Sequence, residues 1–137
     1  MMNYKVHADK ESMFNTPPVF AVYTSMLTLE WLKNLGGIEA IEKENFKKAR
    51  LMYSEIDLNP LFKGFAATED RSLMNATFSL TDDNLKDTFD SMWKDAGING
   101  LNGHRSVGGY RASMYNALSL ESVATLVEVM SELERKA

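Results

Sequence analysis

The chain has 137 residues, enough to bury one sizeable core, and it contains no cysteine, which excludes disulfides, thiolate metal sites and a cysteine nucleophile. Its 45% apolar and 25% charged residues are ordinary for a soluble globular protein, and the net charge of −4 argues against nucleic acid as a partner. No apolar run is long enough to span a membrane and no signal peptide is recognisable, so we expect a cytoplasmic protein that does not contact the membrane.

The N-terminal third is predicted to hold an arm and two helices. Residues 1–15 show no sustained periodicity, and we expect an extended arm or linker cut from a larger protein. The TPP run that follows is typical of a helix start, with Asn15 or Thr16 as the N-cap. This helix should span residues 17–35 and end at Gly36 and Gly37. Because its apolar residues wind around more than one face, we expect it to be largely buried.

A second helix is predicted over residues 38–56. Its apolar residues form one stripe that should face a core, and charged residues occupy the opposite face. We expect this charged face, which includes Lys47, Lys48 and Arg50, to be solvated.

The remaining chain mixes strands and helices. The runs LFKGFAAT (61–68) and SLMNATFSL (72–80) are predicted strands, and Thr81 should cap a third helix that ends at Gly97. INGL (98–101) suggests an edge strand, and GYRASMYNA (109–117) is predicted to form a central strand. The last helix is predicted to start at Ser119. This order predicts an α+β fold of two layers, a mainly antiparallel sheet covered by helices.

One stretch of this acidic chain carries positive charge without compensation. Residues 97–120 contain no Asp or Glu, although the chain has 19 of them, and they include His104, Arg105 and Arg111. In a strand over 109–117, Arg111 points away from the apolar face, while His104 and Arg105 precede it on a loop. Two glycines, Gly108 and Gly109, permit a close approach by another group. We interpret the stretch as an anion site with two parts, Arg111 and the pair of His104 and Arg105; alternatively, the arginines pair with surface carboxylates elsewhere.

A second candidate anion site lies at Asn15 and Thr16, ahead of the first long helix. The two prolines remove amide donors from the first turn, so these side chains would supply the hydrogen bonds; the alternative is a plain N-cap. A metal site built on His7, Asp9 and His104 is not expected, because the only two histidines lie far apart. No pairing of nucleophile and base and no phosphate-cradling glycine loop is recognisable.

Three segments resemble the phosphoserine aminotransferase family in order and spacing. They are NYKVHADKESMFNTPP (3–18), RSLMNATFSL (71–80) and above all GHRSVGGYRASMYNA (103–117). The resemblance implies a homodimeric enzyme that depends on pyridoxal phosphate and transfers an amino group between glutamate and 3-phosphohydroxypyruvate, making phosphoserine for serine biosynthesis. It also implies the fold of the small C-terminal domain of fold-type I pyridoxal phosphate aminotransferases.

This chain resembles only the C-terminal portion of that family. We therefore expect residues 1–137 to be a single small domain, with residues 1–15 as the arm from a missing large domain. The family's Schiff-base lysine lies in the large domain and no lysine here matches it, so the fragment is expected to hold no catalytic residue, to be inactive and not to retain the cofactor.

The resemblance also implies residue roles. Arg111 matches the arginine that binds the substrate α-carboxylate, and His104 and Arg105 match the pair that binds the substrate phosphate or the distal carboxylate of glutamate. Asn15 and Thr16 match the pair that reaches the cofactor phosphate of the neighbouring subunit. Two other hypotheses remain open, a free-standing module that binds a small phosphorylated metabolite and a structural dimerisation domain.

Overall fold

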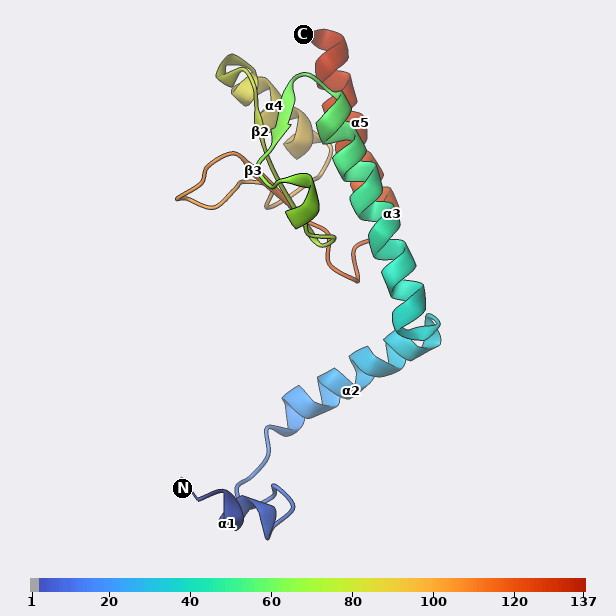
Figure 1. Cartoon of the computed structure of the whole chain (residues 1–137), viewed down its shortest axis with the longest axis vertical. Helices are drawn as coiled ribbons and strands as arrows, with labels where there is room; N and C mark the ends of the chain where they lie inside the picture. The colour runs from blue at the N-terminus through green and yellow to red at the C-terminus, as the bar shows by residue number, and fades with distance from the viewer. Residues whose placement is uncertain (1–2) are drawn as a thin grey trace. The chain divides into compact units, whose positions relative to one another are not determined.

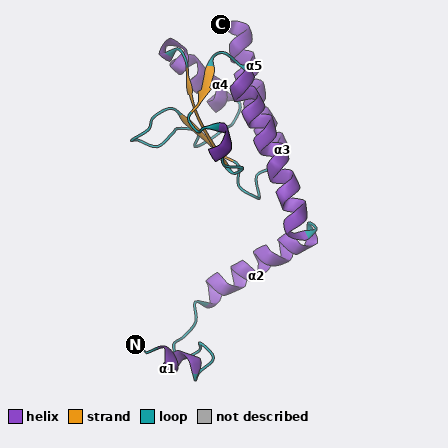
Figure 2. Ribbon diagram, in the orientation of Figure 1, coloured by secondary structure: helices purple, strands orange, loops and turns teal. Residues whose placement is uncertain are grey.

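The computed structural model describes residues 3–137, which form five α-helices, two short 3-10 turns and one three-stranded sheet (Figures 1 and 2). The chain divides into two compact units, Met1–Ile38 and Glu39–Ala137.

The first unit holds the arm and the first long helix. The arm is not simply extended, because it contains a short helix, α1 (Tyr4–Ala8), whose first turn is capped by the Asn3 side chain accepting a hydrogen bond from the Lys5 amide. The long helix α2 spans Val19–Asn34, and both Gly36 and Gly37 adopt positive φ values of 103° and 78° after it. The predicted stop at these glycines is confirmed.

The start and the environment of α2 differ from the prediction. Pro18 occupies the N-cap position and no side chain caps the helix, so the assignment of Asn15 or Thr16 as the N-cap is wrong. The expected burial is also wrong, since none of the 16 residues of α2 is buried within the described chain and Phe20 is 80% exposed. A helix that is apolar around its circumference needs partners on several sides, and residues 3–137 do not supply them.

The second unit is built on a three-stranded antiparallel sheet in the order β1 (Phe62–Gly64), β2 (Asn75–Leu80) and β3 (Tyr110–Ser113). The predicted strand over 109–117 is therefore shorter than expected, and β2 is the central strand. The predicted edge strand over 98–101 is reduced to one bridge, between Asn102 and Tyr110, next to a hydrogen bond from the Arg111 amide to the Leu101 carbonyl.

Three helices pack on one face of this sheet: α3 (Gly37–Leu58), α4 (Lys86–Asp95) and α5 (Leu120–Lys136). Ser119 caps α5 as predicted, because its hydroxyl accepts a hydrogen bond from the Ser122 amide. Thr81 does not cap the third helix; Asp82 caps the 3-10 turn Asp83–Leu85 that leads into α4, and the Thr81 hydroxyl donates to the Pro60 carbonyl. The remaining 3-10 turn, Thr68–Asp70, lies between β1 and β2.

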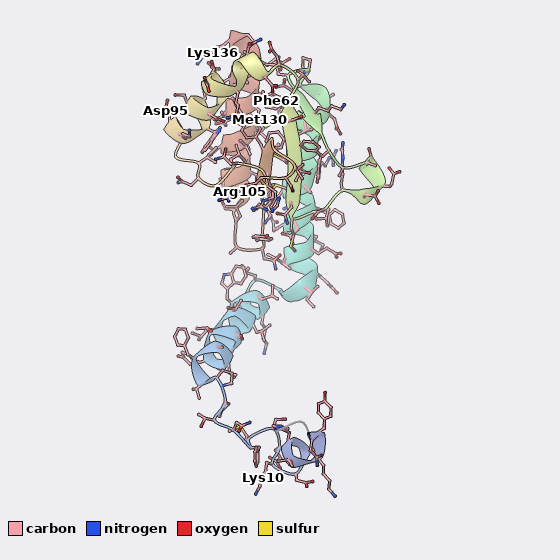
Figure 3. The ribbon with its side chains drawn as sticks, turned by 90° about the vertical axis from the view of Figure 1, so that its left-hand side faces the viewer. Lys10, Phe62, Asp95, Arg105, Met130 and Lys136 are labelled. Atoms are coloured by element: carbon pink, nitrogen blue, oxygen red, sulfur yellow. The ribbon has the colours of Figure 1, made fainter. Side chains whose placement is uncertain are left out.

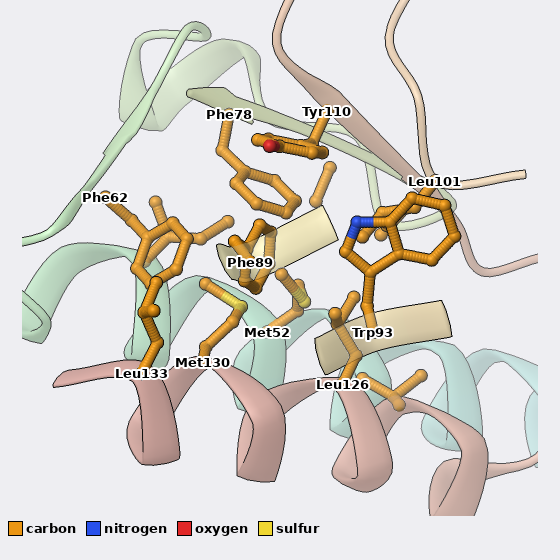
Figure 4. Packing of buried hydrophobic residues seen from close by; sticks show 14 of the residues in the cluster. Met52, Phe62, Phe78, Phe89, Trp93, Leu101, Tyr110, Leu126, Met130 and Leu133 are labelled. Atoms are coloured by element: carbon orange, nitrogen blue, oxygen red, sulfur yellow. The ribbon is translucent and has the colours of Figure 1, made fainter. Parts of the chain in front are cut away.

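The core lies between the sheet and these helices, which confirms the two-layer α+β fold. Alternate residues of the strands are buried, and Figure 4 shows Phe78 and Tyr110 above residues from the helices. The Phe89 ring packs edge-on against Tyr110, with 4.9 Å between ring centroids. The core comprises Met52, Ile56, Phe62, Ala76, Phe78, Leu80, Phe89, Trp93, Leu101, Tyr110, Ala112, Met114, Val123, Leu126, Met130 and Leu133. Because side chains alternate along a strand, the strand residues that do not face this core lie on the other, open face of the sheet.

One residue of α3 contradicts the predicted solvated face. Lys48 is only 1% exposed, whereas its neighbours Lys47 and Arg50 are exposed as expected. Its ammonium group is satisfied by backbone carbonyls, which a helical charge pattern cannot reveal.

Among the helices of residues 3–137, even the apolar α2 lacks the length and hydrophobicity that crossing a membrane would need.

Candidate anion-binding site

Arg111 lies on the open face of the sheet. Along β3 the buried residues Tyr110 and Ala112 alternate with Arg111, which is exposed and directly opposite Thr77 of β2. Its guanidinium group forms no ion pair or hydrogen bond with residues 3–137. The hypothesis that Arg111 pairs with a surface carboxylate of this chain is therefore not what the structure shows.

His104 and Arg105 lie in the loop that leads into β3 (Figure 3 labels Arg105). The ends of this loop are tied together by the bridge between Asn102 and Tyr110 and by the hydrogen bond, 2.8 Å long, from the Gly103 amide to the Gly109 carbonyl. Both side chains are exposed, and Arg105 has no ion pair within the part of the chain that the structure describes. The loop thus presents two further donors near the start of the strand that carries Arg111.

Two glycines of this loop, Gly103 and Gly109, lie where other backbone atoms leave no room for a side chain. A Cβ atom at Gly103 would collide with the Gly108 carbonyl, and one at Gly109 would lie 2.5 Å from the Phe78 carbonyl of β2. Gly109 also has a φ of 61°, which side chains rarely adopt. The close approach that we predicted for Gly108 and Gly109 is therefore made at Gly109 by strand β2, and nothing lies within 4 Å of a Cβ placed at Gly108.

A partly buried carboxylate supports β3 from the helical side. Asp90 of α4 accepts hydrogen bonds from the Tyr110 hydroxyl (2.9 Å), from the Trp93 indole (3.1 Å) and from the Lys86 ammonium group (2.6 Å). Burial alone would raise the pKa of the Asp90 carboxyl, but the hydrogen bonds from Lys86, Tyr110 and Trp93 outweigh it and hold that pKa below its ordinary value of 3.8. Asp90 therefore anchors the residue that precedes Arg111.

The segment after β3 is held by Lys48. Its ammonium group donates to the carbonyls of Met114 (3.2 Å), Tyr115 (2.8 Å) and Leu118 (3.0 Å). Burial lowers the pKa of Lys48, although the nearby Glu44 acts in the opposite direction. Sequence reasoning missed both Asp90 and Lys48, because the contacts that tie them to β3 and to the segment after it, from Tyr110 and to the carbonyls of residues 114–118, join segments far apart in the chain.

A cavity of about 320 Å³ borders the same strand. Residues of β3, including Arg111 and Ser113, line it together with the 96–101 segment and the first turns of α5. Ser122 and Thr125 add hydroxyl groups to a lining that is otherwise mostly apolar. Among the lining residues of this cavity that the structure describes, the one charged side chain is Arg111, which is exposed.

Asn15 and Thr16 belong to the first unit, outside the unit that holds the other three predicted site residues. Both are exposed and neither side chain forms a hydrogen bond with residues 3–137. Since they do not cap α2, their donors stay available to an external phosphate, and short polar side chains of this kind fit such a group. Residues 3–137 bring together no cluster of three or more His, Asp or Glu side chains that could hold a metal ion.

Comparison with known proteins places this chain among aminotransferases. The family model "Aminotransferase class-V" matches residues 1–126. The chain is 68% identical over 136 residues to the phosphoserine aminotransferase of Flavobacterium psychrophilum and 49% identical over 137 residues to that of Bacillus subtilis. In both cases the match covers 99% of this chain and 38% of the relative.

Solved structures agree with the sequence comparison. Phosphoserine aminotransferase from Bacillus circulans subsp. alkalophilus superposes with a TM-score of 0.88 at 40% identity, covering 97% of this chain and 37% of that one. The enzyme from Trichomonas vaginalis, described as bound to pyridoxal phosphate (PLP), gives a TM-score of 0.83 at 36% identity, covering 95% and 38%. The chain thus spans a little over a third of the length of its relatives, and it belongs to the class-V aminotransferase family.

Proposed function

We propose that this chain forms the C-terminal part of a pyridoxal phosphate-dependent phosphoserine aminotransferase. The complete enzyme transfers an amino group between glutamate and 3-phosphohydroxypyruvate in serine biosynthesis and works as a homodimer in the cytoplasm. This part of it binds substrate and cofactor phosphate. The proposal is supported by the family match and by the exposed, unpaired arginines at Arg105 and Arg111.

The observation that carries the proposal is the availability of Arg111 on the open face of β3. A guanidinium group is a planar fork that matches a carboxylate, and both substrates of the reaction share an amino-acid or keto-acid end with one carboxylate. In the proposal, Arg111 binds this common carboxylate. Because the residue has no acidic partner among residues 3–137, no ion pair within them has to break when substrate binds.

The two substrates differ at their far ends, where one has a carboxylate and the other a phosphate. His104 and Arg105 are donors that can bind either group, so one site serves both half-reactions. The phosphate has more charge and more acceptor oxygens, and electrostatics therefore favours the phosphorylated substrate.

Asn15 and Thr16 are assigned to the phosphate of the cofactor in the neighbouring subunit. When bound, pyridoxal phosphate supplies the electron sink on which amino-group transfer depends. Residues of this chain bind and orient, and none of its lysines is assigned to the covalent attachment of the cofactor. The 137-residue chain by itself is consequently expected to be inactive.

The proposal is tested on the full-length gene product by measuring glutamate-dependent amination of 3-phosphohydroxypyruvate. Arg111→Ala should lower kcat/KM by at least about 100-fold, since a charged hydrogen-bonding pair is worth roughly 3 kcal/mol. Arg135→Ala is the matched control, because Arg135 is an exposed arginine of α5 that pairs with Glu132. A wild-type protein without cofactor absorbance or turnover, or an Arg111 variant as active as the control, would refute the proposal.

A further inference from the structure

The His104 side chain is held by its own loop. Its Nδ1 atom lies 2.7 Å from the Ser106 hydroxyl oxygen and 3.3 Å from the Ser106 backbone nitrogen, whose N–H donates to it. A backbone N–H cannot accept a hydrogen bond, so Nδ1 must be the acceptor and can carry no proton in this arrangement. The hydroxyl, which can act either way, then also donates to Nδ1.

We propose that Ser106 is a positioning residue that fixes His104 as the tautomer protonated on Nε2. This inference rests on the proposed function, because it concerns how His104 serves the substrate phosphate or distal carboxylate. With Nδ1 occupied by Ser106, the Nε2–H group is free to donate to an anionic oxygen. In the other tautomer, Nε2 would present a lone pair to that oxygen and repel it.

The backbone of the loop keeps Ser106 within reach of the imidazole. The amides of Val107 (3.0 Å) and Gly108 (2.8 Å) both donate to the His104 carbonyl, closing a turn around Ser106. Gly108 has a φ of 76°, which lets the chain leave this turn and join the sheet. The geometry that selects the tautomer is therefore built into the turn, and it does not require the substrate.

The first arm of the test is a direct reading of the tautomer. Long-range proton–nitrogen NMR spectra of the full-length protein labelled with ¹⁵N-histidine distinguish a protonated from an unprotonated ring nitrogen, and His104→Gln identifies the signal. We expect Nε2 to carry the proton in the wild type, and we expect a smaller excess of that tautomer in Ser106→Ala, which loses the hydroxyl donor and keeps the backbone donor. A wild-type His104 protonated on Nδ1 overturns the inference, whether or not the protein is an aminotransferase.

The second arm measures kinetics. Losing one hydroxyl donor should raise the KM for 3-phosphohydroxypyruvate about 5-fold in Ser106→Ala with little change in kcat, because the interaction is made equally in the ground state and the transition state. Ser106→Thr keeps the hydroxyl and should restore KM, which a merely structural role would not predict. Ser91→Ala, an exposed serine of α4, is the control.

The outcomes separate the inference from the proposed function. An active wild type in which Ser106→Ala matches Ser91→Ala refutes the positioning role and leaves the function standing. A wild type without amination activity refutes the function, and the NMR spectra then decide the tautomer alone.

Discussion

The ammonium group of Lys48, on helix α3, donates a hydrogen bond to the carbonyl of Tyr115, 2.8 Å away and two residues after strand β3. The same group binds the carbonyls of Met114 and Leu118, so one buried cation gathers three acceptors of the segment that follows Arg111. A buried charge is normally costly, and here three backbone dipoles offset its desolvation.

Lys48→Met should therefore destabilise the fold by about 2–4 kcal/mol, because it leaves three carbonyls without a donor. Lys47→Met is the matched control: Lys47 is the preceding residue, its side chain is 59% exposed, and it pairs with Glu44. That change should cost no more than about 0.5 kcal/mol. Urea unfolding of both variants makes the comparison, and equal losses would contradict the role assigned to Lys48.

The contrast between these two neighbours shows what periodicity can and cannot predict. Both lysines belong to the charged face of the helical pattern, and for Lys47 and Arg50 that prediction is right. The burial of Lys48 depends on a segment more than 60 residues further along the chain. Alternation in β3, by contrast, correctly placed Arg111 on the open face, because the two sides of a strand are set by the backbone.

The prediction for α2 failed for a related reason. Its apolar circumference correctly indicates a helix that needs partners, but the described residues leave it exposed. For Asn15 and Thr16 the sequence left an anion site and a plain N-cap as alternatives, because a polar residue at a helix start ordinarily implies a cap, and the structure contradicts the cap. The tautomer of His104 has no sequence signal beyond a serine two residues away, since it depends on the closure of the loop.

The hydrogen bonds that the Asp90 carboxylate accepts from Lys86, Trp93 and Tyr110, here called the Asp90 cluster, predict a pH dependence of stability. Its carboxyl has a folded-state pKa below the ordinary value of 3.8, so the stabilisation is fully present above that value and is lost as the pH falls through the lower folded-state pKa. Asp90→Asn should lose about 1–2 kcal/mol at neutral pH and show a flatter decline as the pH falls below 3.8.

Asp87→Asn, on the exposed part of the same helix, serves as its control. Thermal melts across the acid range give the measurement. If the Asp90 variant declined as steeply as this control, the cluster would not be the source of the acid sensitivity.

Gly109 and Gly97 form a matched pair of glycines with φ values of 61° and 77°. Alanine at either position carries the strain of a positive φ, about 1 kcal/mol. Only at Gly109 does the new Cβ lie 2.5 Å from the Phe78 carbonyl, whereas at Gly97 nothing lies within 4 Å. Gly109→Ala should thus be at least about 1–2 kcal/mol less stable than Gly97→Ala in chemical unfolding. Similar values would show that β2 does not constrain this position.

The exposed apolar surface of α2 predicts the behaviour of the 137-residue chain in solution. Phe20 and Leu29 are 80% and 65% exposed, and surfaces of this kind bind hydrophobic dyes and associate. Phe20→Ser combined with Leu29→Ser should lower dye fluorescence and self-association measured by sedimentation. Glu30→Ser combined with Lys33→Ser, which removes the charges of the same helix, should lower neither.

In the proposed function, two separate groups of side chains, Arg111 and the pair of His104 and Arg105, bind the two ends of one ligand. Calorimetric titration of the full-length protein with phosphoserine and with serine tests it most directly. Arg111→Ala should weaken both ligands, because both carry the α-carboxylate, whereas Arg105→Ala should weaken phosphoserine by about 10-fold or more and leave serine unchanged. Equal losses for both ligands in the Arg105 variant, or unchanged binding in the Arg111 variant, would contradict this division of the site.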